Sequence, residues 1–247
     1  MEKLFALSSI GLVTGIAGTV LTAQQVDAVP AGAQMAGEQG YSVTDFQSVT
    51  AVGPNAVVIS VGAAPSVRAS GGQEALDLYE VVVEDGEFKI QPKDENSWVG
   101  HRPRLEPGTY YVTVPRLSGA TLTGSGDMSV DRVDGGKFSA TVPGSGTLDI
   151  GALAVDDARF TIAGSGDLTA RGAARTSHIS IAGSGDAQAR GVASDAASIS
   201  IAGSGDAALT VNGNADVSIV GSGDVDIGGS ASCAVSRMGS GKVRCDG

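Results

Sequence analysis

Apolar and polar residues alternate with a period of two on both sides of a short phrase, Gly-Ser-Gly-Asp, that recurs through the second half of the chain. Residues two and four positions before the first glycine of the phrase, and four and six positions after that glycine, are almost always apolar. The column two before it runs Leu122, Val142, Ile162, Ile181, Ile201, Ile219 and then Arg237. Since successive side chains of a strand point to opposite faces, each unit is predicted to be strand, tight turn, strand.

The spacing of the phrase predicts the architecture. Its seven copies, some varied, advance in steps of 20, 20, 19, 20, 18 and 18 residues and begin at Gly124, Gly144, Gly164, Gly183, Gly203, Gly221 and Gly239. A unit this short cannot bury its own apolar face and must stack on copies of itself. A meander of hairpins is one solution, but the near-constant step favours a parallel β-helix. We predict an all-β chain with about seven rungs of 18–20 residues over residues 118–247, coiled right-handed.

The phrase itself is predicted to form the corners of the coil. Glycine supplies positive φ and lets stacked backbones approach closely. The serine can bond along the stack, and the aspartate can accept from turn amides as an Asx turn. The structural corner residues expected are Gly124, Gly126, Asp127, Gly164, Gly166, Asp167, Gly183, Gly185, Asp186, Gly203, Gly205, Asp206, Gly221, Gly223 and Asp224.

Stacking would also line up the corner aspartates in a row of like charges, interrupted at Thr147 and ended by Lys242. Such a row costs energy unless it is hydrated or neutralised. One carboxylate per corner is too few for the 6 to 8 oxygens that Ca²⁺ takes. We therefore favour turn capping over a calcium site, and calcium dependence stays open.

Residues 41–117 differ from the repeats in their sequence pattern and are predicted to form a β-rich cap portion before them. Val57–Val61 alternates as a strand, and Asp85-Gly86 between two apolar runs is typical of a type I′ hairpin turn. Gln73–Leu78 is a candidate for one or two helical turns.

Most aromatic residues lie in this first half, and they admit two interpretations. They could form a platform on which a ligand stacks, or they could cap the end of the coil with bulky side chains, which we favour. Trp98, in a polar stretch, is the best candidate for an exposed contact residue. The set is Phe46, Tyr79, Phe88, Trp98, Tyr110 and Tyr111.

The N-terminus is typical of an export signal. Lys3 precedes an uncharged run to Val26, and small residues around Ala28 offer a cleavage site. We expect a signal peptide at 1–28, a flexible linker at 29–40 and a single domain at 41–247; an uncleaved membrane anchor is the alternative. No membrane span is expected after cleavage. The protein would then be periplasmic, outer-surface or secreted.

Charge and composition limit the classes of partner and of structure that the sequence favours. The 247-residue chain has 16 basic and 27 acidic residues and a net charge of -11, which argues against nucleic acid as a partner. Its 37 glycines are periodic and are separated by apolar residues, which argues against disorder. Only 4% of residues are aromatic, as expected of turn-rich β-structure.

The two cysteines, Cys233 and Cys245, lie six residues before and six after Gly239. Both fall in inward columns of the last rung, and in an exported chain such a pair favours a disulfide over free thiols.

Sequence motifs give little support to catalysis. His101 and His178 are isolated, and neither a G-x-S-x-G nucleophile elbow nor a phosphate-binding loop occurs. Arg171, Arg175 and Arg190 are dispersed rather than clustered against the aspartates. We predict no catalytic residues, no metal and no cofactor.

Several segments, taken in order, resemble a known family. They are Phe46–Val49, Val57–Val61, Pro65–Arg68, Val83–Ile90, Tyr111–Leu117 and the Gly-Ser-Gly-Asp repeats. Together they resemble the head GIN domain of putative autotransporter adhesins over Thr44–Asp226. The resemblance implies an all-β extracytoplasmic domain with no assigned catalytic residues.

We therefore expect a non-enzymatic, adhesin-like or envelope interaction module whose envelope or extracellular partner is a glycan or a protein. The sequence leaves self-association open. The alternatives are a carbohydrate-active β-helix enzyme and a purely structural envelope component.

Overall fold

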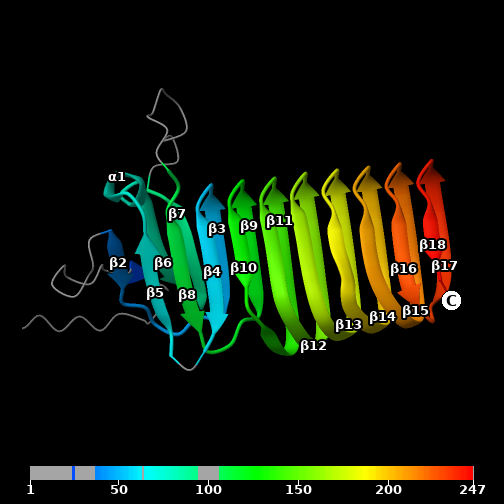
Figure 1. Ribbon diagram of the computed structural model, residues 1–247, viewed down its shortest axis with the longest axis horizontal. Helices are drawn as coiled ribbons and strands as arrows, with labels where there is room; N and C mark the ends of the chain where they lie inside the picture. Colours follow the sequence, from blue (N-terminus) through cyan, green and yellow to red (C-terminus); the bar gives the residue numbers. More distant parts are fainter. Residues whose placement is uncertain (1–23, 26–36, 63, 94–105, 247) are drawn as a thin grey trace, which may run out of the picture.

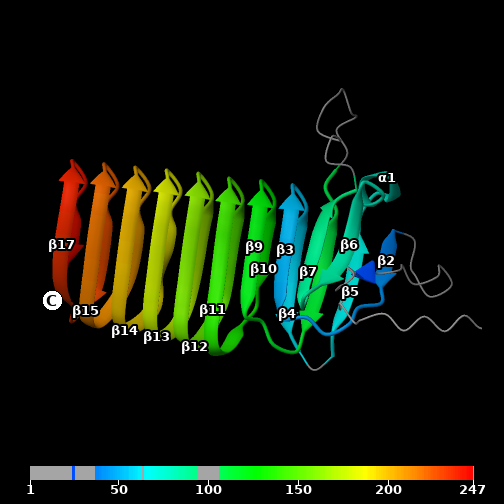
Figure 2. The same ribbon diagram turned by 180° about the vertical axis from the view of Figure 1, so that it is seen from behind.

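The computed structural model describes residues 24–25, 37–62, 64–93 and 106–246, and almost all of them are β-structure. The chain forms a straight shaft that is closed at its N-terminal end by a wider cap (Figure 1). The only helix in the described residues, α1, is one turn long and lies in the cap (Figures 1 and 2). The elements are β1 Gln24–Gln25, β2 Glu38–Tyr41, β3 Ser48–Gly53, β4 Ala56–Val61, β5 Ser66–Ser70, α1 Gln73–Leu76, β6 Tyr79–Glu84, β7 Glu87–Pro92, β8 Thr109–Val114, β9 Gly119–Gly124, β10 Asp127–Val130, β11 Val133–Gly144, β12 Thr147–Gly164, β13 Asp167–Gly183, β14 Ala187–Gly203, β15 Ala207–Gly221, β16 Val225–Gly229, β17 Ser232–Gly239 and β18 Val243–Cys245.

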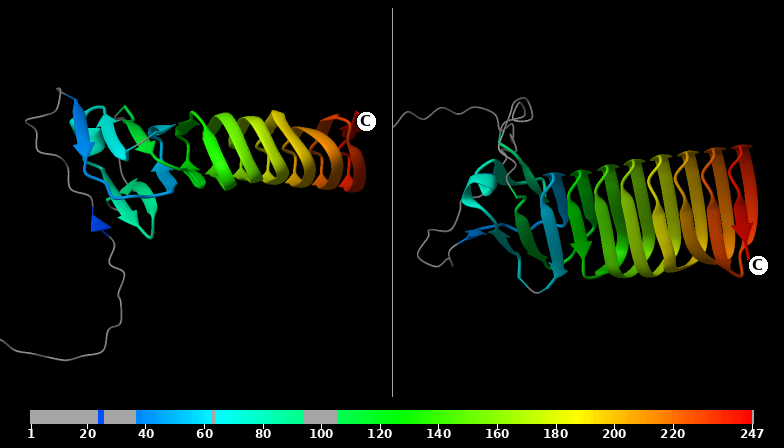
Figure 3. Two further views of the ribbon diagram at one scale, coloured as in Figure 1. Left: turned by 90° about the horizontal axis from the view of Figure 1, so that it is seen from below. Right: turned by 45° about the horizontal axis from the view of Figure 1, so that its top comes forward.

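The shaft is the parallel β-solenoid that the repeat predicts. Each of the long strands β12 to β15 descends one face, bends, and climbs the other face to the next Gly-Ser-Gly corner (Figure 3). Neighbouring turns pair in parallel with identical repeat positions opposite each other, as Ile162 and Ile181 are. The coil makes about six turns rather than about seven, because seven corners enclose six complete turns. The right-handed coiling stays a prediction.

The predicted inward columns form the core. From Ala120 to Ile227, every residue of the four apolar columns is at most 3% exposed. The columns open only in the last rung, where Val235 is 48% exposed and Arg237 is exposed. Because alternation is strict on both flanks, the outward residues between them are left to solvent.

Two rungs of the stack come from the first half of the chain. The strands β3 and β4 pair in parallel with β9 and β10, so Gly53 lies under Gly124 as one more corner. Beneath them, β7 and β8 pair in parallel with β3 and β4. The order in space is therefore β7/β8, β3/β4 and β9/β10, although β3/β4 comes first in the chain. The segment 41–117 thus contributes part of the shaft as well as the cap.

The cap replaces parallel stacking by antiparallel pairing. On one face β6 pairs antiparallel with β7, and on the other β5 pairs antiparallel with β8. The predicted hairpin between β6 and β7 is confirmed, since Asp85 and Gly86 have φ of 52° and 76°. The predicted helical turn is also present as α1, which buries Leu76.

The aromatic residues pack as a cap in the described part of the chain. Phe46 and Phe88 stack with ring centroids 5.0 Å apart, and Tyr110 is fully buried. Tyr111 is 40% exposed on the outer surface. Trp98, the candidate contact residue, lies outside the described residues.

Most of the predicted signal peptide and linker also lies outside the described residues. Two short strands lie in these predicted segments: β1, within the predicted signal peptide, pairs antiparallel with β6, and β2, which begins at Glu38 in the predicted linker, pairs antiparallel with β5. The boundaries at residues 28 and 40 stay predictions.

Candidate functional site

The Gly-Ser-Gly phrases lie at stacked corners along one edge of the shaft, where each first glycine has positive φ. In Gly183 this φ is 134°, and a Cβ there would overlap the carbonyl oxygen of Gly164 in the rung before. A Cβ on Gly185 would likewise overlap the carbonyl oxygen of Gly166. Both glycines are thus required by the close approach of successive backbones.

The corner aspartates bond between rungs and not within their own turn. The N–H of Asp206 donates to Oδ1 of Asp186 at 2.9 Å, and the N–H of Asp224 donates to Oδ1 of Asp206 at 2.7 Å. The same bond joins Asp186 to Asp167 and Lys242 to Asp224. The expected Asx turn is therefore replaced by a ladder of side-chain bonds along the shaft. Within the described residues, no three His, Cys, Asp or Glu side chains lie together as a metal site.

The predicted disulfide joins Cys233 of β17 to Cys245 of β18, with Cα atoms 6.6 Å apart. It ties together the two faces of the last rung. In the same rung the Arg237 guanidinium donates to the carbonyl oxygen of Gly241 at 2.7 Å, at the last Gly-Ser-Gly corner.

One of the two histidines, isolated in the sequence, lies close to a carboxylate in the structure. Nε2 of His178 lies 3.6 Å from Oδ2 of Asp157, and each side chain is about one-third exposed. No hydrogen bond within the described residues links this pair to a serine or cysteine. His101 lies outside the described residues.

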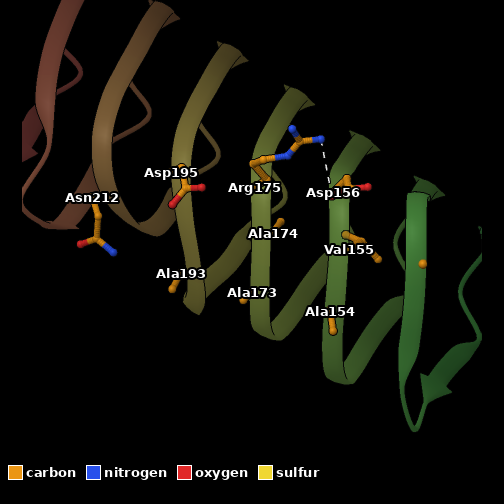
Figure 4. A pocket seen from close by; sticks show the side chains of 10 residues that line it. Ala154, Val155, Asp156, Ala173, Ala174, Arg175, Ala193, Asp195 and Asn212 are labelled. Carbon is orange, nitrogen blue, oxygen red and sulfur yellow. Dashed lines mark ion pairs between the residues drawn. The ribbon is translucent and has the colours of Figure 1, made fainter.

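A candidate site is an open groove at the second bend of the coil, midway between successive corners (Figure 4). It runs along the shaft from Gly135 of β11 to Asn212 of β15, across five rungs, and has a volume of about 470 Å³. With strands ~4.8 Å apart, four steps between rungs give it a length of ~19 Å.

Strand alternation and residue size create this groove. Val155 and Ala174 point inward and are buried, whereas the residues on either side of them point outward. One outward column is Ala154, Ala173 and Ala193, whose methyl groups form a low floor (Figure 4). The other outward column is Asp156, Arg175 and Asp195, whose longer side chains form a wall.

The wall alternates in charge along the shaft. Arg175 leans toward Asp156, with Nη2 3.4 Å from Oδ1, and both side chains are more than 60% exposed (Figure 4). Asp195 follows one rung later on the other side of Arg175. The groove can thus offer apolar contact along its floor and hydrogen-bond acceptors and donors along its wall, which suits non-covalent binding of an extended polar chain.

Sequence reasoning missed this groove because it followed only the six residues on each side of a corner. The signal lies farther out, nine or ten residues after the first glycine of a phrase, where Ala154, Ala173 and Ala193 recur. Alanine in an outward column is not evidence of a site by itself. The bend that turns this column into a floor is visible only in the structure.

The fold and the groove define a parallel β-solenoid that presents an extended surface, as repeat proteins of this class do. The chain belongs to the family described as putative auto-transporter adhesin, head GIN domain, whose model matches residues 45–231. The last rung and its disulfide lie beyond that match. No curated protein matches the sequence.

Solved structures share the fold. A putative adhesin from Bacteroides fragilis has a TM-score of 0.76 at 19% identity and covers 83% of this chain and 94% of its own. A putative lipid binding protein from Parabacteroides distasonis has a TM-score of 0.66 at 22% identity, with the same coverage. A putative adhesin from Parabacteroides merdae has a TM-score of 0.65 at 18% identity, again with 83% and 94% covered. Neither the family description nor these three names describe an enzyme.

Among the described residues, no helix is long and apolar enough to span a membrane.

Proposed function

We propose that this protein is an exported, adhesin-like interaction module of the cell envelope that binds a polar partner along the shaft without chemical turnover. The observation that carries the proposal is the groove: a floor of small side chains beside a wall of exposed Asp156, Arg175 and Asp195, repeated rung after rung. A rigid shaft can hold such a surface in register over its whole length.

Membership of the adhesin family supports a binding role, and the chemistry of the groove favours an extended glycan or peptide as the partner. The wall carries charged and hydrogen-bonding groups, and the floor offers methyl groups but no wide apolar cavity. An extended glycan or peptide can use both surfaces, whereas an acyl chain would leave the charged wall without partners.

Binding can be tested by filling the floor. Ala173→Gln places a longer side chain in the middle of the groove, and Ala182→Gln makes the same change at another exposed outward position of β13. We expect the unaltered protein and the Ala182 variant to be retained on immobilised envelope or host glycans, or on isolated cell envelopes, and the Ala173 variant to lose retention at least tenfold. Equal retention of both variants would show that the groove is not the binding surface.

The same experiment separates the alternatives. Release of shortened glycan products would support the carbohydrate-active enzyme instead. Neither retention nor product formation would favour the purely structural envelope component.

Export is tested independently by cell fractionation with surface proteolysis and by mass spectrometry of the mature N-terminus. We expect the mature chain to begin at Val29 and to be found outside the cytoplasm. An intact N-terminus in the membrane fraction would favour the uncleaved anchor.

A further inference from the structure

A second hollow, which shares no residue with the groove, lies near the C-terminal end of the shaft and has a volume of about 340 Å³. It is the more enclosed of the two, and side chains of both charges line it. The charged residues are Arg190, Lys242, Arg244, Asp206, Asp224 and Asp226.

A single small residue opens this hollow. Gln188, Ala208, Asp226 and Arg244 occupy the same outward column on four successive rungs. Ala208 is the short member of the column and leaves a gap between longer side chains. Arg190 reaches over the gap to pair with Asp226, two rungs farther along the shaft. Ala208 is only 6% exposed as a result.

Cations are concentrated here. Three of the nine lysines and arginines between residues 118 and 246 line this one hollow, in a chain whose net charge is -11. Arg190 and Arg244 both pair with the same oxygen, Oδ2 of Asp226, the latter at 3.4 Å. Since a guanidinium has five N–H donors, each arginine retains donors for another acceptor.

Some carboxylate oxygens of the hollow already accept hydrogen bonds from the protein. Oδ1 of Asp206 and Oδ1 of Asp224 accept rung amides at 2.7 and 2.8 Å. Oδ1 of Asp226 is buried and has no hydrogen-bond partner in the described part of the chain. A buried acceptor of this kind is costly unless it receives a donor. The hollow therefore presents free donors from its cations beside the second carboxylate oxygens of Asp206 and Asp224, whose side chains are exposed.

We propose that this hollow binds an acidic sugar residue. The sugar carboxylate lies against Arg190, Arg244 and Lys242, where planar guanidinium and carboxylate groups match. Neighbouring sugar hydroxyls donate to the exposed oxygens of Asp206 and Asp224. A simple anion would leave these carboxylates facing a like charge. The volume, at the small end of the ~300–1,000 Å³ typical of ligand pockets, suits one sugar residue.

Titration calorimetry of the purified protein, disulfide intact, tests the site with sodium glucuronate and galacturonate as probes. We expect at least one of the two to bind and glucose, which lacks the carboxylate, to bind at least tenfold more weakly. Arg190→Gln and Lys242→Gln should each weaken binding about tenfold, with thermal melting confirming that both variants fold. Arg171→Gln is the matched control, because Arg171 holds the same position relative to its corner and pairs with Asp149 at 3.3 Å outside the hollow.

No binding of either uronate would overturn the proposal. Equal binding of inorganic phosphate would reduce the site to a general anion site, and stronger binding of phosphoethanolamine would assign it to a zwitterion; both results contradict an acidic sugar. Because Ala173→Gln leaves this hollow unchanged, uronate binding can fail or succeed separately from the function proposed for the groove.

Discussion

At the scale of single residues, the shaft depends on the absence of side chains at the corner glycines. The first glycine of each phrase has positive φ, and both glycines lie against the backbone of the rung before. The sequence predicted both a turn that needs glycine and a close approach of stacked backbones at the corners. The φ of the second glycine lies outside the positive range, so its backbone conformation alone does not require glycine. Glycine is needed there because a Cβ would overlap the backbone of the rung before.

Gly183→Ala should be strongly destabilising. The new Cβ would overlap the carbonyl oxygen of Gly164 and would force a φ of 134° on alanine, so we expect a loss of roughly 3 kcal/mol or more in the free energy of unfolding. Gly136→Ala is the control, since its nearest neighbour would be a side-chain oxygen 3.9 Å away. Denaturant unfolding measures both, and equal midpoints would contradict this account of the corners.

The aspartate ladder predicts a smaller, graded effect at Asp206. Replacement by alanine removes the acceptor of the Asp224 N–H and should cost about 1 kcal/mol. Asp206→Asn keeps an oxygen acceptor without the charge, so the loss should be about half as large. Asp216→Ala, at an exposed aspartate on the strand before the next corner and outside the ladder, should change stability little. Equal losses for Asn and Ala would show that charge, and not hydrogen bonding, is the relevant property.

At the scale of elements, the sequence predicted the regular rungs and missed the irregular ones. The segment Gly53-Pro54-Asn55 forms a corner, with Val49 and Ala51 before it and Val57 and Ile59 after it at the repeat spacing. It escaped recognition because Asn55 replaces the second glycine and because 71 residues separate Gly53 from Gly124. A period can be read from the chain only where rungs follow one another, and here β5 to β8 intervene.

The pairing of Cys233 with Cys245, by contrast, followed from their columns in the repeat. Replacing both by serine should lower the free energy of unfolding by ~3 kcal/mol, since the disulfide closes a 13-residue segment. Hydrogen exchange should quicken in β17 and β18 and remain slow in β13. Two reactive thiols in the unreduced native protein would contradict the pairing.

The cap should be sensitive to alkaline pH. Burial, with the charge of Asp77 as a second cause, raises the pKa of Tyr41 from 10 to about 12. Burial also raises the pKa of Tyr110. Because the folded state favours the neutral phenols, their contribution to stability is complete below pH 10 and is lost as the pH rises toward 12.

Between pH 10 and 12, Tyr41→Phe should therefore lose less free energy of unfolding than the unaltered protein loses, as followed by denaturant unfolding at each pH. Tyrosinate absorbance gives an independent measure of the titration. Identical pH profiles for the variant and the unaltered protein would remove Tyr41 from this account.

At the scale of the whole molecule, the two ends of the solenoid differ: the N-terminal end is covered, and the C-terminal end of the described chain is open. Antiparallel strands on both faces and α1 cover the N-terminal end (Figure 2). At the C-terminal end of the described chain, β17 and β18 present strand edges, and Val235 and Met238 are 48% and 72% exposed. Exposed parallel edges invite pairing with another chain unless charges discourage it.

Arg237 is well placed to provide that charge. It occupies the column that is apolar in the rungs before it, and it bonds to Gly241 at the last corner. Arg237→Ile would continue the apolar column to the end and remove the charge, so we expect concentration-dependent association that the unaltered chain does not show. Sedimentation velocity over a hundredfold range of concentration measures this. Arg159→Ile, which adds the same side chain to the lateral face, is the control. If neither variant associates more than the unaltered protein, the edges of the last rung are protected by something other than Arg237.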